Sequence, residues 1–177
     1  MTDPSEDHIV VDGPMLVERL QSAGIIVERA DDLELTDDFR IALHSRMDEL
    51  GNEDTLRDVV AEKFELEPDG LTFGKRADHQ FGVRHDDVEL GSWSSKAALI
   101  ADLTLDQLLR EWFPLWERLD GFSRGELLTR LRGFLEECPI CDGHLEMIED
   151  AEDPADGTDV TLICTACDRT VFDGTFY

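Results

Sequence analysis

Two identical cysteine pairs near the C-terminal end are the residues of this chain most suited to chemistry. Cys138-Pro-Ile-Cys141 and Cys164-Thr-Ala-Cys167 contain all four cysteines of the 177-residue sequence. A gap of roughly twenty residues between two such pairs is typical of a four-thiolate zinc site. Each pair can bring two sulfurs to one side of a tight turn, so both together can complete a tetrahedron around one metal ion. The spacing predicts one Zn²⁺ ion held by Cys138, Cys141, Cys164 and Cys167.

Other uses of these cysteines fit the sequence less well. Two disulfides would suit a secreted chain, but residues 1–12 are acidic and lack the apolar run of a signal peptide. A redox Cys-x-x-Cys pair is expected at a helix N-terminus on a βαβ scaffold, whereas the second pair lies between two β-rich runs. Iron stays open on spacing alone. Because four thiolates leave no open position, a zinc ion here is expected to be structural and not catalytic.

The charge of the chain is strongly negative, with 42 acidic residues against 16 basic ones and a formal net charge of −26. The acids are spread along the whole length, Asp outnumbers Glu, and only Lys63, Lys75 and Lys96 are lysines. This composition is typical of a protein from a salt-in halophile. In ~1 M salt the Debye length shortens to ~3 Å, which screens the repulsion between the carboxylates of the chain. We therefore expect a halophilic, cytoplasmic protein. A mimic of nucleic acid, or a binder of a basic partner, is the rival explanation.

Disorder and membrane insertion do not fit the apolar residues. They make up 41% of the chain and recur at helical spacing, which indicates a folded core. No apolar run approaches the length of a membrane span, so no membrane partner is expected. The expected organisation is a flexible acidic tail over residues 1–12, a mainly helical domain over residues 13–137, and a zinc-ribbon module over residues 138–177.

The helical domain is outlined by apolar spacing and by capping residues. Thr36 is expected to cap one helix, and Pro14 to stand at the start of another. Thr104 with Gln107, and Ser123 with Glu126, match the capping-box pattern and predict two further helix starts. Residues 65–91 contain several glycines and predict loop and short strand. The expected helices cover approximately residues 14–23, 36–50, 54–64, 96–103, 104–113 and 123–137, with short strands at 25–27 and 33–35.

Residues 138–177 are expected to form a small antiparallel sheet. Its strands are predicted at Leu145–Ile148, Val160–Ile163 and Thr170–Phe172. About forty residues cannot bury a self-sufficient core, so metal binding worth ~10–16 kcal/mol in small zinc peptides would supply the missing stability. The preceding helix is predicted to run directly into Cys138, which indicates a module docked on the helical domain. The fold class expected for the whole chain is α+β.

A family resemblance supports the metal ligands. Cys138-Pro-Ile-Cys141-Asp-Gly, with Cys164-Thr-Ala-Cys167, resembles the zinc-ribbon pattern in which Cys-Pro-x-Cys and a following Gly form the first knuckle. The chain is similar to a set of uncharacterised haloarchaeal proteins, in which a segment like residues 91–102 precedes one like residues 131–141. This resemblance implies the four zinc ligands and no activity, because ribbons occur in transcription, translation and interaction proteins alike.

The remaining site candidates each have a simpler structural explanation. The segment 91–96 could bind an anion through serine hydroxyls and a lysine, but an ordinary helix N-cap explains it as well. His79 and His85 could hold a second metal ion if they share a strand face, although surface histidines are commoner. Trp112 and Trp116 could line a partner groove, but their helical spacing favours a place in the core.

Three functions follow from these observations. The first is a non-enzymatic interaction protein, in which a structural ribbon docked on a helical domain presents a surface to a protein or nucleoprotein partner. The second is a DNA-binding regulator with a winged-helix-like N-terminal part, weakened because the basic residues form no stripe. The third is an enzyme of unspecified reaction in the helical domain, although no catalytic triad, nucleophile elbow or dinucleotide fingerprint is present in the sequence.

Overall fold

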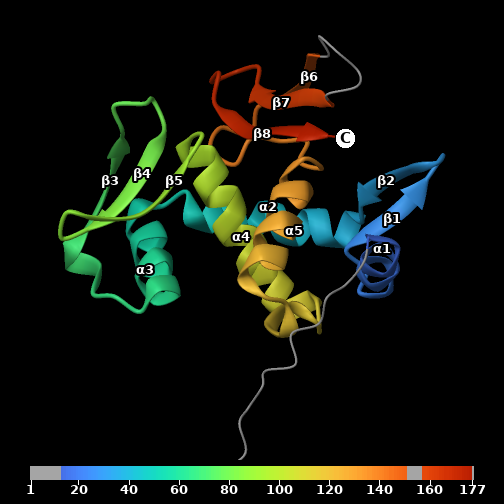
Figure 1. Ribbon diagram of the computed structural model, residues 1–177, viewed down its shortest axis with the longest axis horizontal. Coiled ribbons are helices and arrows are strands. Elements are labelled where there is room, and N and C mark those ends of the chain that lie inside the picture. The colour runs from blue at the N-terminus through green and yellow to red at the C-terminus, as the bar shows by residue number, and fades with distance from the viewer. Residues whose placement is uncertain (1–12, 151–156, 177) are drawn as a thin grey trace, which may run out of the picture.

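The protein is a mixed α/β fold in which helices surround a central helix and three small antiparallel sheets lie at the periphery. The computed structural model describes residues 13–150 and 157–176. The predicted acidic tail, residues 1–12, lies outside the described residues. Figure 1 shows the central helix α4 (Lys96–Trp112) and α5 (Gly121–Arg132) in the middle of the molecule, with the C-terminal sheet above them.

Short polar residues start the helices where the chain changes direction. The Thr36 hydroxyl accepts the backbone N–H of Phe39 at 3.2 Å and so caps α2 (Asp37–Leu50), and Asn52 caps α3 (Glu53–Phe64) in the same way. The helix α1 (Gly13–Ser22) is followed by Gly24, whose φ of 74° allows the chain to turn into the first strand. These three helices match the predicted segments.

The expectation of a mainly helical domain before residue 138 holds only in part. The strands β1 (Ile26–Arg29) and β2 (Asp32–Leu35) form the expected hairpin. Residues 71–93 form a three-stranded sheet that the sequence indicated only as loop and short strand: β3 (Leu71–Lys75), β4 (Phe81–His85) and β5 (Val88–Trp93). Asp86 and Asp87, both at positive φ, make the tight turn between β4 and β5.

Two predicted helix starts are wrong. Thr104 begins no helix, because α4 runs without interruption from Lys96 to Trp112 and Thr104 lies fully buried inside it. The cap of α5 is Asp120, whose carboxylate accepts the backbone N–H of Ser123 at 2.6 Å. In both places a capping-box pattern occurs within a helix. Burial of α4 on nearly all sides overrides the local signal at Thr104.

The core is built around α4. Its segment Ala97–Ala101 is fully buried, and the helix contacts α2, α3, α5, β5 and β8. Trp112 packs edge-to-face on Phe39 at 5.2 Å between ring centroids, and Trp116 is buried beneath the Arg124 guanidinium. Trp116 is therefore a core residue, as its spacing predicted, and Trp112 is partly buried against the core. Helix α4 ends before Pro114, since Phe113 before it is already extended.

The C-terminal sheet consists of β6 (Leu145–Asp150), β7 (Thr158–Cys164) and β8 (Thr170–Phe176), in the order β6-β7-β8. All three strands overlap the predicted ones.

Within the residues that the structure describes, no helix has the length and apolar character needed to cross a membrane.

Candidate metal centre

The fold brings the four cysteine sulfurs together at one end of the C-terminal sheet. All four Sγ atoms lie within 4.8 Å of one another, with Cys138 at 3.7 Å from Cys167 and Cys141 at 3.4 Å from Cys164. Four sulfurs at ~2.3 Å from a central zinc would be ~3.8 Å apart at the corners of a tetrahedron. The observed spacing is therefore compatible with a four-thiolate metal site.

The two cysteine pairs are built on the same backbone turn. In each turn, the residue after the second cysteine is an aspartate with φ of 59°, Asp142 in the first and Asp168 in the second. Each aspartate donates its N–H to the carbonyl of the first cysteine of its pair, at 3.1 Å and 3.0 Å. The first pair follows α5 and the second joins β7 to β8. This repeated Cys-x-x-Cys-Asp turn aims all four thiols at one point.

The second turn also donates to sulfur directly. The backbone N–H groups of Ala166 and Cys167 each donate to the Cys164 sulfur at 3.4 Å. Backbone N–H groups of Ile140 and Cys141 act on Cys138 in the first turn. The two turns therefore place backbone N–H donors around the thiol cluster as well as the thiols themselves.

The backbone of Gly143 lies so close to the sulfurs that no side chain fits at this position. A Cβ atom at this position would lie 2.8 Å from the Cys164 sulfur, 3.1 Å from the Cys141 sulfur and 2.8 Å from the Ala166 methyl group. All three distances are shorter than normal contacts. The glycine after the first turn is thus required by the close approach of the two cysteine pairs.

The surroundings of the thiols affect their acidity in opposite directions. Burial raises the pKa of the Cys138 thiol to about 12. The backbone N–H of Gly143 favours the Cys141 thiolate, but the Cys164 thiol, desolvation and the Cys167 thiol together outweigh it and raise the pKa of Cys141. Burial alone would raise the pKa of Cys167, yet hydrogen bonds from Arg169 lower it to about 6. A divalent cation would favour the thiolate at every position, since it adds positive charge to the cluster.

Comparison with known sequences places most of the chain in a family. The sequence model for the central domain of a family of unknown function, DUF8054, matches residues 15–133. The chain belongs to the DUF8054 family. No curated protein and no solved structure matches it. The DUF8054 central domain therefore spans α1 to α5, and the four cysteines lie beyond its matched end.

The cysteine-bearing sheet is held against the DUF8054 central domain by direct hydrogen bonds. The carbonyl of Thr170 on β8 accepts bonds from the hydroxyl groups of Ser94, at 3.2 Å, and Ser95. The Ser95 hydroxyl also accepts the Ala98 N–H and caps α4, which confirms the N-cap interpretation of residues 91–96. Arg132 at the end of α5 donates to the Val171 carbonyl at 3.3 Å. The metal centre and the central domain thus share a continuous interface.

Three partly buried polar side chains linked by hydrogen bonding and charge support this interface. The Trp93 indole N–H donates to Asp102 at 2.9 Å, and Asp102 pairs with Arg132 at 3.1 Å. Desolvation raises the pKa of Asp102, although Arg132 and Trp93 both favour its charged form. No sequence motif indicated these contacts, because Arg132 lies far along the chain from Trp93 and Asp102. Together they connect β5, α4 and α5 to β8.

The histidines take no part in the thiol cluster. His79 lies in a turn and His85 at the end of β4, and the two join no group of potential metal ligands among the described residues. The carbonyl of His144 accepts the N–H and the hydroxyl of Thr165, both at 3.0 Å, which ties the two cysteine turns together. His144 therefore has a positioning role through its backbone.

Sequence analysis missed one further histidine. His44 on α2 lies 3.3 Å from Glu137, 3.8 Å from Asp48 and 3.9 Å from Asp142. His44, Asp48 and Asp142 could offer ligand atoms to a metal ion, but all are solvent-accessible, and exposed acidic groups commonly lie together without an ion. The contacts link α2 to the first cysteine turn, and the link depends on long-range packing that no sequence motif indicates.

Proposed function

We propose that this DUF8054 protein is a non-enzymatic interaction protein, in which a structural zinc ribbon docked on a helical domain presents a surface to a protein or nucleoprotein partner. The observation that carries the proposal is the convergence of the four Sγ atoms of Cys138, Cys141, Cys164 and Cys167 within 4.8 Å. The proposed division places the ribbon at residues 138–177 and the domain at residues 13–137.

Zinc is the metal that best explains the site. Four cysteine ligands at tetrahedral spacing satisfy Zn²⁺ completely and leave no position for substrate or water. The ribbon buries few large side chains of its own, among them Leu145, Leu162 and Phe172. A sheet of this size needs additional stabilisation, which a structural zinc ion supplies. The ion therefore stabilises the fold of the ribbon, and partner binding is the function that we assign to its surface.

Two features of the ribbon surface favour binding. Met147 and Ile148 on the edge strand β6 are each 50% exposed, although both are large and apolar. Strand edges and exposed apolar side chains are characteristic of interaction surfaces.

Many of the arginines are paired with carboxylates, as Arg46 is with Glu111 and Arg76 with Glu89. That pairing favours a protein partner over direct binding to DNA; the DNA-binding and enzymatic alternatives stay predictions.

The proposed setting is the cytoplasm of a halophile. The net charge of −26 on a 177-residue chain is compatible with a compact state where molar salt screens repulsion between carboxylates. The proposed partner must therefore bind in high salt, where weak surface ion pairs contribute little. Apolar contacts are then the main source of affinity.

Metal analysis and affinity capture test the two parts of this proposal separately. Protein purified in molar KCl should contain one zinc per chain, and Cys138→Ser or Cys167→Ser should release it and make residues 138–177 sensitive to protease. Immobilised protein should retain a specific partner from native extract in the same salt, compared with an unrelated protein of similar charge. Stoichiometric metal in either serine variant would contradict the four-ligand site. Absence of a specific partner would contradict the interaction role.

A further inference from the structure

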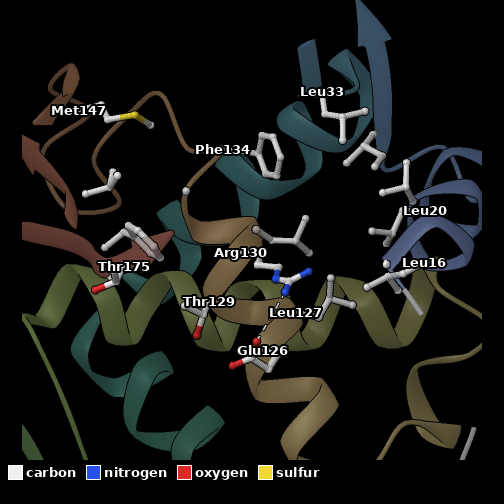
Figure 2. A pocket seen from close by; sticks show the side chains of 18 residues that line it. Leu16, Leu20, Leu33, Glu126, Leu127, Thr129, Arg130, Phe134, Met147 and Thr175 are labelled. Carbon is white, nitrogen blue, oxygen red and sulfur yellow. Dashed lines mark ion pairs between the residues drawn. The ribbon is translucent and has the colours of Figure 1, made fainter. Parts of the chain in front are cut away.

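An open apolar cavity lies between the central domain and the ribbon. Its volume is about 800 Å³, within the range of protein binding pockets. Figure 2 shows Leu16, Leu20 and Leu33 on one side and Met147 on the other, with Leu127 between them. The walls thus come from α1, the β1–β2 hairpin and the ribbon, while α5 forms the floor. Such an apolar space between two structural units is a favoured place for binding.

The dimensions of the floor suit a helix. The lining part of α5 begins at Glu126, and the cavity continues to Phe134 just beyond the helix end. This is approximately two helical turns, or about 12 Å at 1.5 Å per residue. An amphipathic helix that binds in a groove inserts apolar side chains at positions i, i+3, i+4 and i+7, which also span about two turns. The cavity can therefore accept one apolar face of a short helix.

Charge favours a basic occupant. Arg130 is the cation that lines the cavity, and Glu126 pairs with it at 3.8 Å across one turn of α5. The charge of Arg130 is therefore offset locally, while the chain as a whole has a formal net charge of −26. In ~1 M salt the Debye length is only ~3 Å, so this charge acts only at contact distance. An occupant with lysine or arginine on its outer face can pair there with surrounding carboxylates, whereas a small apolar anion such as a fatty acid cannot.

We propose that this groove binds an amphipathic helix of a partner protein, with the apolar face of the helix inward and its basic face outward. This inference rests on the proposed interaction function and names the class of the partner. Met147 adapts the groove to its occupant, because methionine is flexible and polarizable and half of this side chain is exposed. The ribbon contributes one wall, so a zinc-stabilised ribbon completes the binding site.

Adjacent residues on β6 provide a matched pair of test variants. Met147 lines the groove, whereas Ile148 does not, and side chains at successive strand positions point to opposite faces. Both are 50% exposed, so Met147→Glu and Ile148→Glu each replace an equally exposed apolar side chain with an acid. The added negative charge would not repel a basic peptide. Weaker binding by Met147→Glu alone would therefore report loss of an apolar contact.

The probe is a fluorescein-labelled peptide of about 14 residues, roughly four turns, with leucine at i, i+3, i+4 and i+7 and lysine on the opposite face. Its control is a shuffled peptide of the same composition. Fluorescence anisotropy is measured with the full chain in ~1 M KCl, where the Debye length is ~3 Å. We expect the amphipathic peptide to bind at least about tenfold more tightly than the shuffled one. Met147→Glu should weaken binding about tenfold, and Ile148→Glu should change it by less than about twofold.

Metal content and circular dichroism of both variants establish that each is folded. Equal binding of the two peptides, or equal effects of the two variants, would overturn the proposal. A dimer of the chain that Met147→Glu dissociates would identify a second copy as the occupant and also overturn it. Displacement of an environment-sensitive dye by decanoate but not by the peptide would identify a small-molecule pocket. If Met147→Glu keeps a partner captured from extract, the interaction function stands and the groove assignment fails.

Discussion

Gly143 provides a sharp test of the metal centre, because two sulfur atoms occupy the space where a side chain would begin. In Gly143→Ala the new methyl group would lie 2.8 Å from the Cys164 sulfur and 3.1 Å from the Cys141 sulfur. Relief of these contacts requires the two cysteine turns to move apart by several tenths of an ångström. Zinc–sulfur distances tolerate only about 0.2 Å, so the cost falls directly on metal binding.

The expected magnitude follows from overpacking a tightly packed site. Such substitutions cost about 1–3 kcal/mol, which corresponds to a loss of zinc affinity of about 5- to 150-fold. Competition with a chromophoric chelator measures this loss directly. Gly125→Ala is the matched control, because a Cβ atom there meets no other atom within 4 Å and Gly125 lies inside α5. It should leave zinc affinity unchanged and stabilise the fold by about 0.5–1 kcal/mol.

Equal zinc affinity in Gly143→Ala and the unchanged protein would refute this reasoning. It would show that the two cysteine pairs can separate without loss of ligation, and hence that they do not share one ion. A loss of affinity in Gly125→Ala of similar size would instead attribute the effect to general destabilisation. The two variants thus separate a local steric effect from a global one.

Three further predictions concern pH, the domain interface and salt. Zinc affinity should rise with pH by at least about two decades per unit between pH 6 and 8, because binding displaces protons from Cys138, whose pKa is raised to about 12, and from Cys141, whose pKa is also raised. Below about pH 6 the dependence should steepen as Cys167 protonates too, since its pKa is lowered to about 6; a flat profile in competition titrations would contradict thiolate ligation. Arg132→Met should lower the free energy of unfolding by about 2–4 kcal/mol, because it leaves Asp102 buried without its partner, and it should leave metal content unchanged. Adding Asp102→Asn should recover part of that loss in denaturant titrations, whereas strict additivity would show that the pair is not coupled. Dilution from molar to low salt should unfold the chain as followed by circular dichroism, and indifference to salt would count against halophilic adaptation.

The metal ligands could be predicted because their signal is local. The two Cys-x-x-Cys pairs indicate both the residue types of the ligands and the turns that hold them. The aspartate after each pair, Asp142 and Asp168, was a further local signal, since aspartate tolerates the left-handed backbone that each turn adopts. The identity of all four clustered cysteines therefore follows from sequence spacing alone.

The sheet over residues 71–93 could be predicted only in outline. Gly74 and Gly82 face each other in neighbouring strands, so the alternation of side chains that marks a strand is interrupted on both sides. The turn at Asp86 and Asp87 lacks the glycine that usually identifies a two-residue hairpin loop. Local pattern therefore indicated short strands without revealing how they pair.

Long-range features were out of reach of the sequence. The neighbours of Thr104 in sequence resemble those of a helix cap, and only the packing of other elements around α4 shows that Thr104 lies within a buried helix. The Asp102–Arg132 pair and the groove beside Met147 arise where distant segments meet. Their positions depend on the tertiary arrangement and carry no motif.

The most direct measurement of the central claim is the metal content of the full chain purified in molar KCl without added metal or chelator. Elemental analysis should find one zinc per chain, lost when Cys138 or Cys167 is replaced by serine. Protein that is folded by circular dichroism and carries no zinc would contradict the account.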